Sequence, residues 1–160
     1  MTDLSKQLIF EEGLKLDAYR CTAGHKTIGI GHNIDAKPKF HGNPIPDKLE
    51  SVDQALAILD DDIREAKAGL EKLWPTLSLL PDGPRKDALI QMAFQLGASG
   101  VLKFRKMLLA VQRQDWALAY AEALDSEWAR VDTPARARRV ARQFITNEYY
   151  EVPTFNKFHD

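Results

Sequence analysis

The chain has 160 residues, of which 44% are hydrophobic and 28% charged, and its formal net charge is −1. This size and composition are typical of one globular domain or of two small lobes that share a core. The near-zero net charge does not favour a general nucleic-acid binder, and a single cysteine excludes an internal disulfide. No apolar run approaches the roughly 20 residues of a membrane span, and the first residues lack the apolar core of a signal peptide.

The first predicted element is a short amphipathic helix over residues 3–12. Leu4, Leu8 and Glu12 follow helical spacing. Gly13 is a natural stop, because glycine enters the left-handed conformation without steric cost. Glu12 then lies in the last turn, at the negative end of the helix dipole, where its protonated form is favoured.

The next stretch has the period of short β-strands. Strands are expected at residues 16–18 and 27–30, with a turn at residues 22–24 between them, which predicts a small antiparallel sheet. Gly29-Ile30-Gly31 lacks the rest of a nucleotide-binding fingerprint, so it is interpreted as a tight turn at a strand end. Residues 35–50 contain three prolines and are expected to form a loop or an edge hairpin.

A long helix is predicted over residues 51–73. It opens with the capping box Ser51-Val52-Asp53-Gln54 and ends before Trp74-Pro75. At about 1.5 Å per residue it is roughly 34 Å long. A helix of this length could run between an N-terminal lobe and a C-terminal lobe.

Every element after residue 82 is predicted to be helical. One helix begins at Pro84 and closes at Gly97, and a second runs from Ser99 through Val111. Asp115 caps a third. The last helix, rich in arginine, begins with Thr133 as cap and Pro134 at the first position, and runs to about residue 146. Four aromatic residues of the tail are expected to pack back on the first helix: Tyr149, Tyr150, Phe155 and Phe158.

The candidate catalytic set is Glu12, Cys21 and Thr27. Glycoside hydrolysis needs a protonated carboxyl for the leaving oxygen, and a group on the opposite face of the sugar that activates water or attacks. Glu12 suits the first role, and the Thr27 hydroxyl could hold a water. Taken alone, a glutamate at a helix end is most often a surface charge, so spacing by itself does not decide the function.

These residues form part of a longer pattern that is specific. The stretch Glu12-Gly13-x-x-Leu16-x-x-Tyr19, then Gly24, then Thr27-Ile28-Gly29-Ile30-Gly31-His32 closely resembles the T-even phage lysozymes. Two later segments also resemble that family: Ala93-Phe94-Gln95-Leu96-Gly97-Ala98-Ser99-Gly100-Val101 and Thr133-Pro134-Ala135-Arg136-Ala137-Arg138-Arg139-Val140. With three motifs in order, the resemblance covers nearly the whole chain.

The resemblance implies a muramidase that hydrolyses the β-1,4 bond between N-acetylmuramic acid and N-acetylglucosamine in peptidoglycan. It also implies an α+β, mainly α fold with two lobes and a substrate cleft between them. We expect one lysozyme domain over residues 1–160. Its small sheet lobe spans about residues 14–50, its bridging helix about 51–73, and its helical lobe about 74–160 together with the N-terminal helix.

The same resemblance assigns the catalytic roles. Glu12 falls on the general acid and Thr27 on the threonine that positions water. Cys21 falls on the second catalytic position, which is usually an aspartate. Arg136 matches the arginine that pairs with the general acid. His32 and Asp62 match a structural ion pair of the family. The candidates to contact substrate are Phe94, Gln95, Gly31 and Asn33.

Cys21 leaves three interpretations open, because an unperturbed thiol has a pKa of about 8.5 and is largely neutral at neutral pH. It could act as a thiolate, either base or nucleophile, if neighbouring groups lower its pKa. It could be tolerated while Glu12 and Thr27 carry the catalysis. The enzyme could also be impaired. A thiolate base acting through water would invert the anomeric carbon, whereas a thiolate nucleophile would retain it.

The remaining expectations concern partners and location. The histidines have no partners at metal-ligand spacing, so neither a metal nor a cofactor is expected. The expected partner is bacterial peptidoglycan, with no nucleic acid, no stable membrane insertion and a monomeric state. The enzyme would accumulate in the host cytoplasm and reach the periplasmic wall as an endolysin through a holin, or act as part of a virion. Two alternative functions are a peptidoglycan-binding or virion-associated module with weak catalysis, and a lytic transglycosylase.

Overall fold

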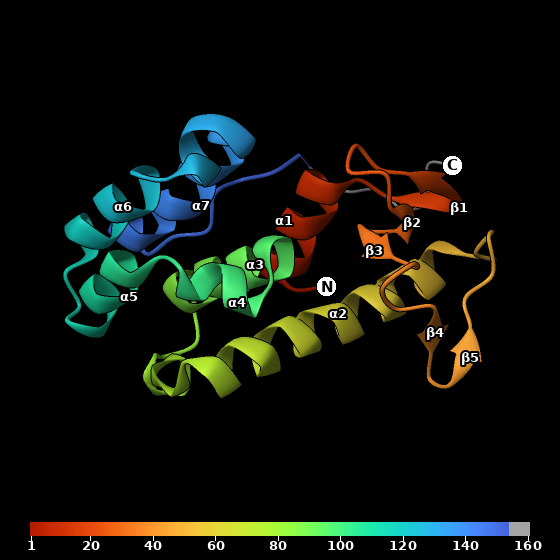
Figure 1. Cartoon of the computed structure of the whole chain (residues 1–160), viewed down its shortest axis with the longest axis horizontal. Coiled ribbons are helices and arrows are strands. Elements are labelled where there is room, and N and C mark those ends of the chain that lie inside the picture. The colour runs from red at the N-terminus through yellow and green to blue at the C-terminus, as the bar shows by residue number, and fades with distance from the viewer. Residues whose placement is uncertain (154–160) are drawn as a thin grey trace. The chain divides into compact units, whose positions relative to one another are not determined.

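The computed structural model of the protein describes residues 1–153, and it is mainly helical with a small proportion of strand. Figure 1 shows the elements in chain order. They are α1 Asp3–Glu12, β1 Lys15–Arg20, β2 Lys26–Gly29, β3 His32–Asn33, β4 Lys39–Phe40, β5 Asn43–Pro44, α2 Val52–Leu73, the 3₁₀ helix η1 Pro75–Leu79, α3 Pro84–Leu96, α4 Ala98–Leu102, α5 Arg105–Gln112, α6 Trp116–Leu124, the π-helix η2 Trp128–Asp132 and α7 Pro134–Thr146. The predicted α+β, mainly α fold class is confirmed.

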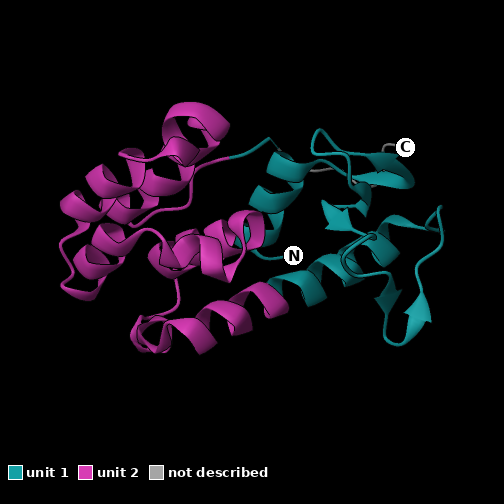
Figure 2. Ribbon diagram, in the orientation of Figure 1, with its two compact units in different colours: residues 1–63, 152–160 teal, residues 64–151 magenta. Residues whose placement is uncertain are grey.

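The chain divides into two compact units, which Figure 2 colours separately. Unit 1 comprises residues 1–63 with Val152 and Pro153, and unit 2 comprises residues 64–151. The boundary falls within α2, between Ile63 and Arg64. The residues of α1 belong to unit 1 with the sheet, although this helix was expected to group with the helical lobe. The single-domain arrangement itself stays a prediction.

Helix α1 has the ends that its sequence predicts. At its start, the Thr2 hydroxyl accepts the backbone N–H of Ser5 at 3.1 Å. At its end, Gly13 has a φ of 76°, and its N–H donates to the Ile9 carbonyl at 2.9 Å. A left-handed residue directly after Glu12 therefore ends the helix, as expected for glycine.

The small sheet has three antiparallel strands in the order β1-β2-β3. The strand predicted at residues 27–30 corresponds to β2, and the turn predicted at residues 22–24 follows β1. Strand β3 was not predicted, because two residues are too few to show a period. Strands β4 and β5 form a separate hairpin, which agrees with the expected edge hairpin.

Helix α2 begins where its capping residues place it. The Ser51 hydroxyl accepts the N–H of Gln54 at 3.2 Å, and the Gln54 side-chain carbonyl accepts the N–H of Glu50 at 2.6 Å. The helix packs against the end of β2, where a Cβ added to Gly29 would make an ordinary van der Waals contact with the Ala55 side chain at 3.6 Å. Strand β2 is thereby anchored on the first half of α2.

The helices of unit 2 pack in pairs, α5 on α6, α6 on α7, and α3 on both α4 and α7. The prediction of a single helix from Ser99 through Val111 is wrong, because two helices, α4 and α5, occupy this stretch. The chain leaves the helical conformation at Phe104, which has a ψ of 58°. The ring of Phe104 meets Trp128 edge to face with centroids 5.8 Å apart, a tertiary contact that helical spacing does not reveal.

The start of α7 follows the prediction only in part. Pro134 takes the first helical position, but Thr133 makes no side-chain cap bond and instead accepts a hydrogen bond from Gln95 at 3.1 Å. In the tail, the Tyr149 hydroxyl donates to Asp87 of α3 at 2.6 Å, and the Tyr150 hydroxyl bonds Gln91 of the same helix. These hydroxyls therefore bind α3, a different helix from the one predicted. Phe155 and Phe158 lie outside the described residues.

Candidate active site

Glu12 lies across the backbone of Gly31. A Cβ built on Gly31 would lie 2.7 Å from Glu12 Oε1 and 3.0 Å from its Cδ, so a side chain at this position would force the Glu12 carboxyl group to move. Gly31 also has a φ of 65°, a conformation that favours glycine. The turn between β2 and β3 thus supports the carboxyl group that ends α1. Two residues predicted for the site, Glu12 and Gly31, are brought into contact.

Three side chains form a row across the sheet. Tyr19 of β1 pairs with Thr27 of β2, and Thr27 pairs in turn with Asn33 of β3. Residues directly opposite each other in antiparallel strands project from the same face. The register therefore places two predicted residues, Thr27 and Asn33, on one face of the sheet with Tyr19 beside them.

Cys21 follows β1 and begins a tight turn that folds around its sulfur. The Cys21 N–H donates to the His25 carbonyl at 3.0 Å, and the Gly24 N–H donates to the Cys21 carbonyl at 2.8 Å. The pKa of the Cys21 thiol is lowered, chiefly by the backbone N–H of His25. Burial opposes this shift, and hydrogen bonds from Ala23, from the Thr27 hydroxyl and from Gly24 add to it. Backbone N–H groups that converge in this way stabilise an anion, here the thiolate.

Thr27 is buried, with only 5% of its surface exposed. Its hydroxyl donates to the His25 carbonyl at 3.0 Å and is one of the groups that lower the pKa of the Cys21 thiol. A hydroxyl has one hydrogen to donate and two lone pairs. The same group can therefore donate to a thiolate or to the carbonyl while it accepts from a water.

Tyr19 is the residue of this face that sequence reasoning left out of the candidate site. Its pKa is raised, first by burial and then by the negative charges of Glu12 and Cys21. Both candidate catalytic groups therefore act electrostatically on one phenol. The Lys15 ammonium lies 4.4 Å from the centroid of the Tyr19 ring and holds it from one side. The signal available in the sequence was its place in the motif Glu12-Gly13-x-x-Leu16-x-x-Tyr19.

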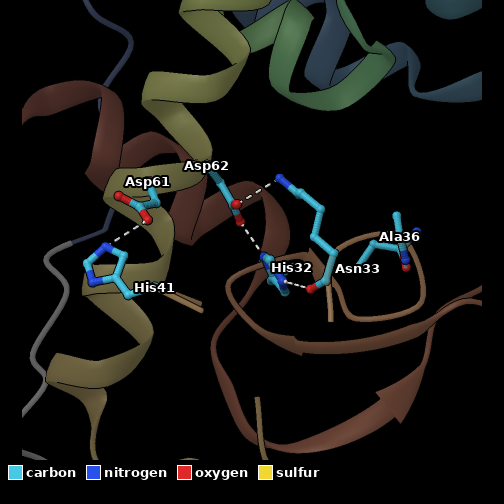
Figure 3. A network of polar contacts seen from close by, with 7 residues as sticks. His32, Asn33, Ala36, His41, Asp61 and Asp62 are labelled. Atoms are coloured by element: carbon cyan, nitrogen blue, oxygen red, sulfur yellow. Dashed lines mark hydrogen bonds and ion pairs between the residues drawn. The ribbon is translucent and has the colours of Figure 1, made fainter. Parts of the chain in front are cut away.

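His32 and Asp62 form the ion pair that the resemblance implies, within unit 1 (Figure 3). His32 Nδ1 lies 2.7 Å from Asp62 Oδ2, and His32 Nε2 lies 2.8 Å from the Lys37 carbonyl oxygen. The Lys37 ammonium donates to the other oxygen of Asp62 at 2.8 Å. Since both ring nitrogens face oxygen acceptors, the doubly protonated imidazolium satisfies both.

The pKa of His32 reflects the balance of this environment. Burial, the largest effect, lowers it, but the hydrogen bond and charge of Asp62 and the Lys37 carbonyl together raise the pKa of His32 above its usual value. The charged histidine thereby fastens β3 to α2. Its neighbour Asn33 accepts the N–H of Ala36 at 3.0 Å through its side-chain oxygen, so the predicted substrate residue also closes a turn (Figure 3).

The predicted site residues of unit 2 lie on α3 and α7. Phe94 is half-buried. The Gln95 side chain is engaged within the unit, because it donates to the Thr133 hydroxyl at 3.1 Å and accepts the Trp128 indole N–H at 3.0 Å. Arg136 is buried, and its Nε donates to the side-chain oxygen of Gln91 at 3.3 Å. The side chains of Gln95 and Arg136 thus make hydrogen bonds within unit 2.

Within residues 1–153, no group of three or more histidine, cysteine, aspartate or glutamate side chains has the geometry to hold a metal ion. Within the same range, no helix combines the length and the apolar character that crossing a membrane requires.

Comparison with known proteins places these residues in a family. The family model of phage lysozyme matches residues 10–142. The probable T4-type lysozyme 2 of Dictyostelium discoideum is 31% identical and aligns with 94% of this chain and 98% of its own length. The probable T4-type lysozyme 1 of the same organism is 32% identical, covering 88% and 92%. The pre-baseplate central spike protein Gp5 of Enterobacteria phage T4 is 33% identical, and the match covers 89% of this chain but 28% of that protein.

Proposed function

The chain belongs to the phage lysozyme family and is a peptidoglycan hydrolase of the lysozyme type, and we propose that it cleaves the β-1,4 bond between N-acetylmuramic acid and N-acetylglucosamine. The observation that carries this proposal is the cluster in unit 1. There Glu12 rests on Gly31, and Thr27 and the Cys21 turn lie on the neighbouring sheet. An acid and an activating group within one small region are what glycoside hydrolysis requires.

Glu12 is proposed as the general acid. In this role its carboxyl proton moves to the glycosidic oxygen as the bond to the anomeric carbon breaks, which leaves an oxocarbenium-like sugar. Gly31 lies against the carboxyl group of Glu12 and bounds it on one side. Such a contact helps to position the acid, and positioning of a reacting group contributes to catalysis.

Cys21 is proposed to work as a thiolate, and Thr27 to hold the attacking water. The hydrogen bonds that lower the pKa of Cys21 favour the charged form that either a base or a nucleophile needs. As a base, the thiolate would take a proton from a water held by Thr27, and the product would be inverted. As a nucleophile, it would bond to the anomeric carbon first, and water would release a retained product.

The unit 2 residues are proposed to support this reaction. Arg136 would pair with the general acid, and Phe94 and Gln95, together with Gly31 and Asn33 of unit 1, would contact the glycan. The internal bonds of Gln95 support a positioning role, since they fix its amide in one orientation. His32 and Asp62 are proposed to support the sheet on α2. We further propose that the protein is a single lysozyme domain, that it acts as a monomer and that it needs no cofactor.

Two biological settings remain for this activity. We propose an endolysin that leaves the host cytoplasm through a holin, a setting that the match to the phage lysozyme family supports. A second candidate is a lysozyme domain associated with a virion. It is favoured by the match to the central spike protein, of which the chain spans 28%. In either setting the substrate is peptidoglycan.

The function is tested with purified peptidoglycan as substrate. The wild-type protein should release reducing sugar ends, and Glu12→Gln should release them at least 10²-fold more slowly, the lower range of a lost general acid. Binding of both proteins to the sedimented wall is measured in parallel. If the wild type binds wall but releases no more sugar than Glu12→Gln, the protein is a binding module and the proposed reaction is wrong.

A further inference from the structure

The Tyr19 hydroxyl makes no hydrogen bond within residues 1–153, although its side chain is half-buried. A buried tyrosine usually satisfies its hydroxyl with a protein group, whereas a half-buried one can offer its hydroxyl to a ligand. The two C-terminal tyrosines do so, since Tyr149 donates to Asp87 and Tyr150 bonds Gln91. The ring of Tyr19 is contacted by the Lys15 ammonium, which lies 4.4 Å from the ring centroid. The hydroxyl at the other end of the side chain is available to a ligand.

The position of Tyr19 relates it to each candidate catalytic group. It stands directly opposite Thr27 on the same face of the sheet. Cys21 follows two residues after Tyr19, immediately beyond the end of β1. The charges of Glu12 and Cys21 both act on the phenol, so it lies in the field of the two groups that flank the reaction.

We infer that Tyr19 is a substrate-binding residue, whose hydroxyl donates a hydrogen bond to a glycan oxygen next to the bond that is cleaved. The inference rests on the proposed muramidase function and names a contact that the family resemblance does not assign. The acceptor is a hydroxyl, ring or acetamido oxygen of the sugar. Lys15 positions the donor by holding the ring.

The charge state of the phenol fits this role. Burial and then the negative charges of Glu12 and Cys21 raise the pKa of Tyr19, so its hydroxyl keeps its hydrogen to a higher pH than an unperturbed tyrosine does. The same field disfavours anions at this position. A neutral sugar oxygen is therefore a better partner than a carboxylate of the wall peptide.

The test is a titration with soluble glycan oligomers released from peptidoglycan. Glu12→Gln serves as background, so that the oligomers are not cleaved. Adding Tyr19→Phe should raise Kd by about 3- to 10-fold, the loss expected for one hydrogen bond. The melting temperature should stay the same, because this hydroxyl has no partner among the described residues to lose. In the Glu12-containing enzyme, the same substitution should raise KM more than it lowers kcat.

Tyr149→Phe is the matched control, because it removes a hydroxyl that the protein itself uses. It should lower the melting temperature through loss of the 2.6 Å bond to Asp87 and leave Kd unchanged. An unchanged Kd for Tyr19→Phe overturns the inference. So does a lowered kcat with a shifted pH profile and an unchanged KM, which would mean that the hydroxyl acts on Glu12 or Cys21.

Failure of this inference is distinct from failure of the proposed function. The titration reads binding in a protein that does not cleave, whereas the function is read from sugar ends released by the wild type. A protein that binds oligomers through Tyr19 yet releases no sugar ends would contradict only the proposed reaction. A protein that cleaves normally without the Tyr19 hydroxyl would contradict only the inference.

Discussion

At the scale of single residues, the contact between Glu12 and Gly31 gives the most local prediction. Gly31→Ala would place a Cβ 2.7 Å from the Glu12 carboxyl oxygen and so displace the proposed acid. We expect activity on peptidoglycan to fall by about 10-fold or more, as misplacing a reacting group by an ångström does. Stability should fall by roughly 1–2 kcal/mol, because alanine is strained at a φ of 65°.

Gly42→Ala is the control for this substitution. Gly42 has a φ of 80°, so alanine carries a similar backbone cost there, but an added Cβ meets nothing within 4 Å. Denaturant unfolding and wall hydrolysis are measured on both variants. Equal losses of activity would mean that backbone strain, and not displacement of Glu12, explains the effect.

The turn around Cys21 predicts an unusually acidic thiol. The rate of alkylation by iodoacetamide, followed against pH, should give a pKa below the ordinary value of about 8.5, because the N–H of His25 and further donors stabilise the thiolate. Gly24 has a φ of 84°, so Gly24→Ala should distort this turn and move the measured pKa of Cys21 upward. A wild-type value at or above 8.5 would contradict the account of the turn.

The catalytic role of Cys21 is tested by exchanging its charge. Cys21→Ser removes the thiolate and should lower wall hydrolysis by about 10² or more. Cys21→Asp restores a negative charge and should keep much of the activity. It should also move the acidic limb of the kcat/KM profile to lower pH, because aspartate ionises near pH 3.9. If the serine variant matches the wild type, Cys21 is only tolerated.

At the scale of elements, the His32–Asp62 pair predicts a pH-dependent attachment of β3 to α2. The folded-state pKa of His32 is raised above the unfolded value of about 6.5. The stabilisation by charged His32 is therefore complete below pH 6.5, and it is lost as pH rises through the folded-state pKa. His32→Gln should reduce the free energy of unfolding by on the order of 1–3 kcal/mol at low pH, and by less at high pH.

His41→Gln provides the comparison for this prediction. His41 also pairs with an aspartate of α2, Asp61, at 3.2 Å, but 69% of its side chain is exposed (Figure 3). Exposed ion pairs contribute little, so this variant should unfold almost as the wild type does at each pH. A deficit in His32→Gln that is constant from pH 5 to 9 would contradict the assigned charge of His32.

Local chemistry explains which elements the sequence could predict. Gly13 ends α1, Ser51 caps α2 and Asp115 caps α6, where its carboxylate accepts the Leu118 N–H at 3.2 Å. Each signal acts within four residues of its own position, so it can be read from the chain alone. The position of Glu12 in the last turn of α1 could be predicted in the same way, because Gly13 directly after it ends the helix.

Tertiary contacts explain what the sequence could not predict. Phe104 interrupts a helical pattern where its ring meets Trp128, and the Thr133 hydroxyl accepts a hydrogen bond from Gln95 instead of capping α7. The partners lie 24 and 38 residues away in the chain. Cys21 is similar at the site, since only the folded turn shows which N–H groups surround its sulfur. Family resemblance, not periodicity, supplied the roles of the candidate catalytic residues.

At the scale of the whole molecule, the central claim is that this chain hydrolyses a glycosidic bond of peptidoglycan with water. A muramidase, a binding module and a lytic transglycosylase leave different products, so product identity separates them. The two settings proposed above, free endolysin and virion-associated domain, share this chemistry. The claim therefore does not depend on how the protein reaches the wall.

Mass spectrometry of the muropeptides released from purified peptidoglycan tests this claim most directly. We predict soluble fragments that end in reducing N-acetylmuramic acid, formed by the wild type and nearly absent with Glu12→Gln. Fragments that end in 1,6-anhydro-N-acetylmuramic acid would show a reaction without water and contradict the account. Fragments that end in reducing N-acetylglucosamine would contradict the assigned bond.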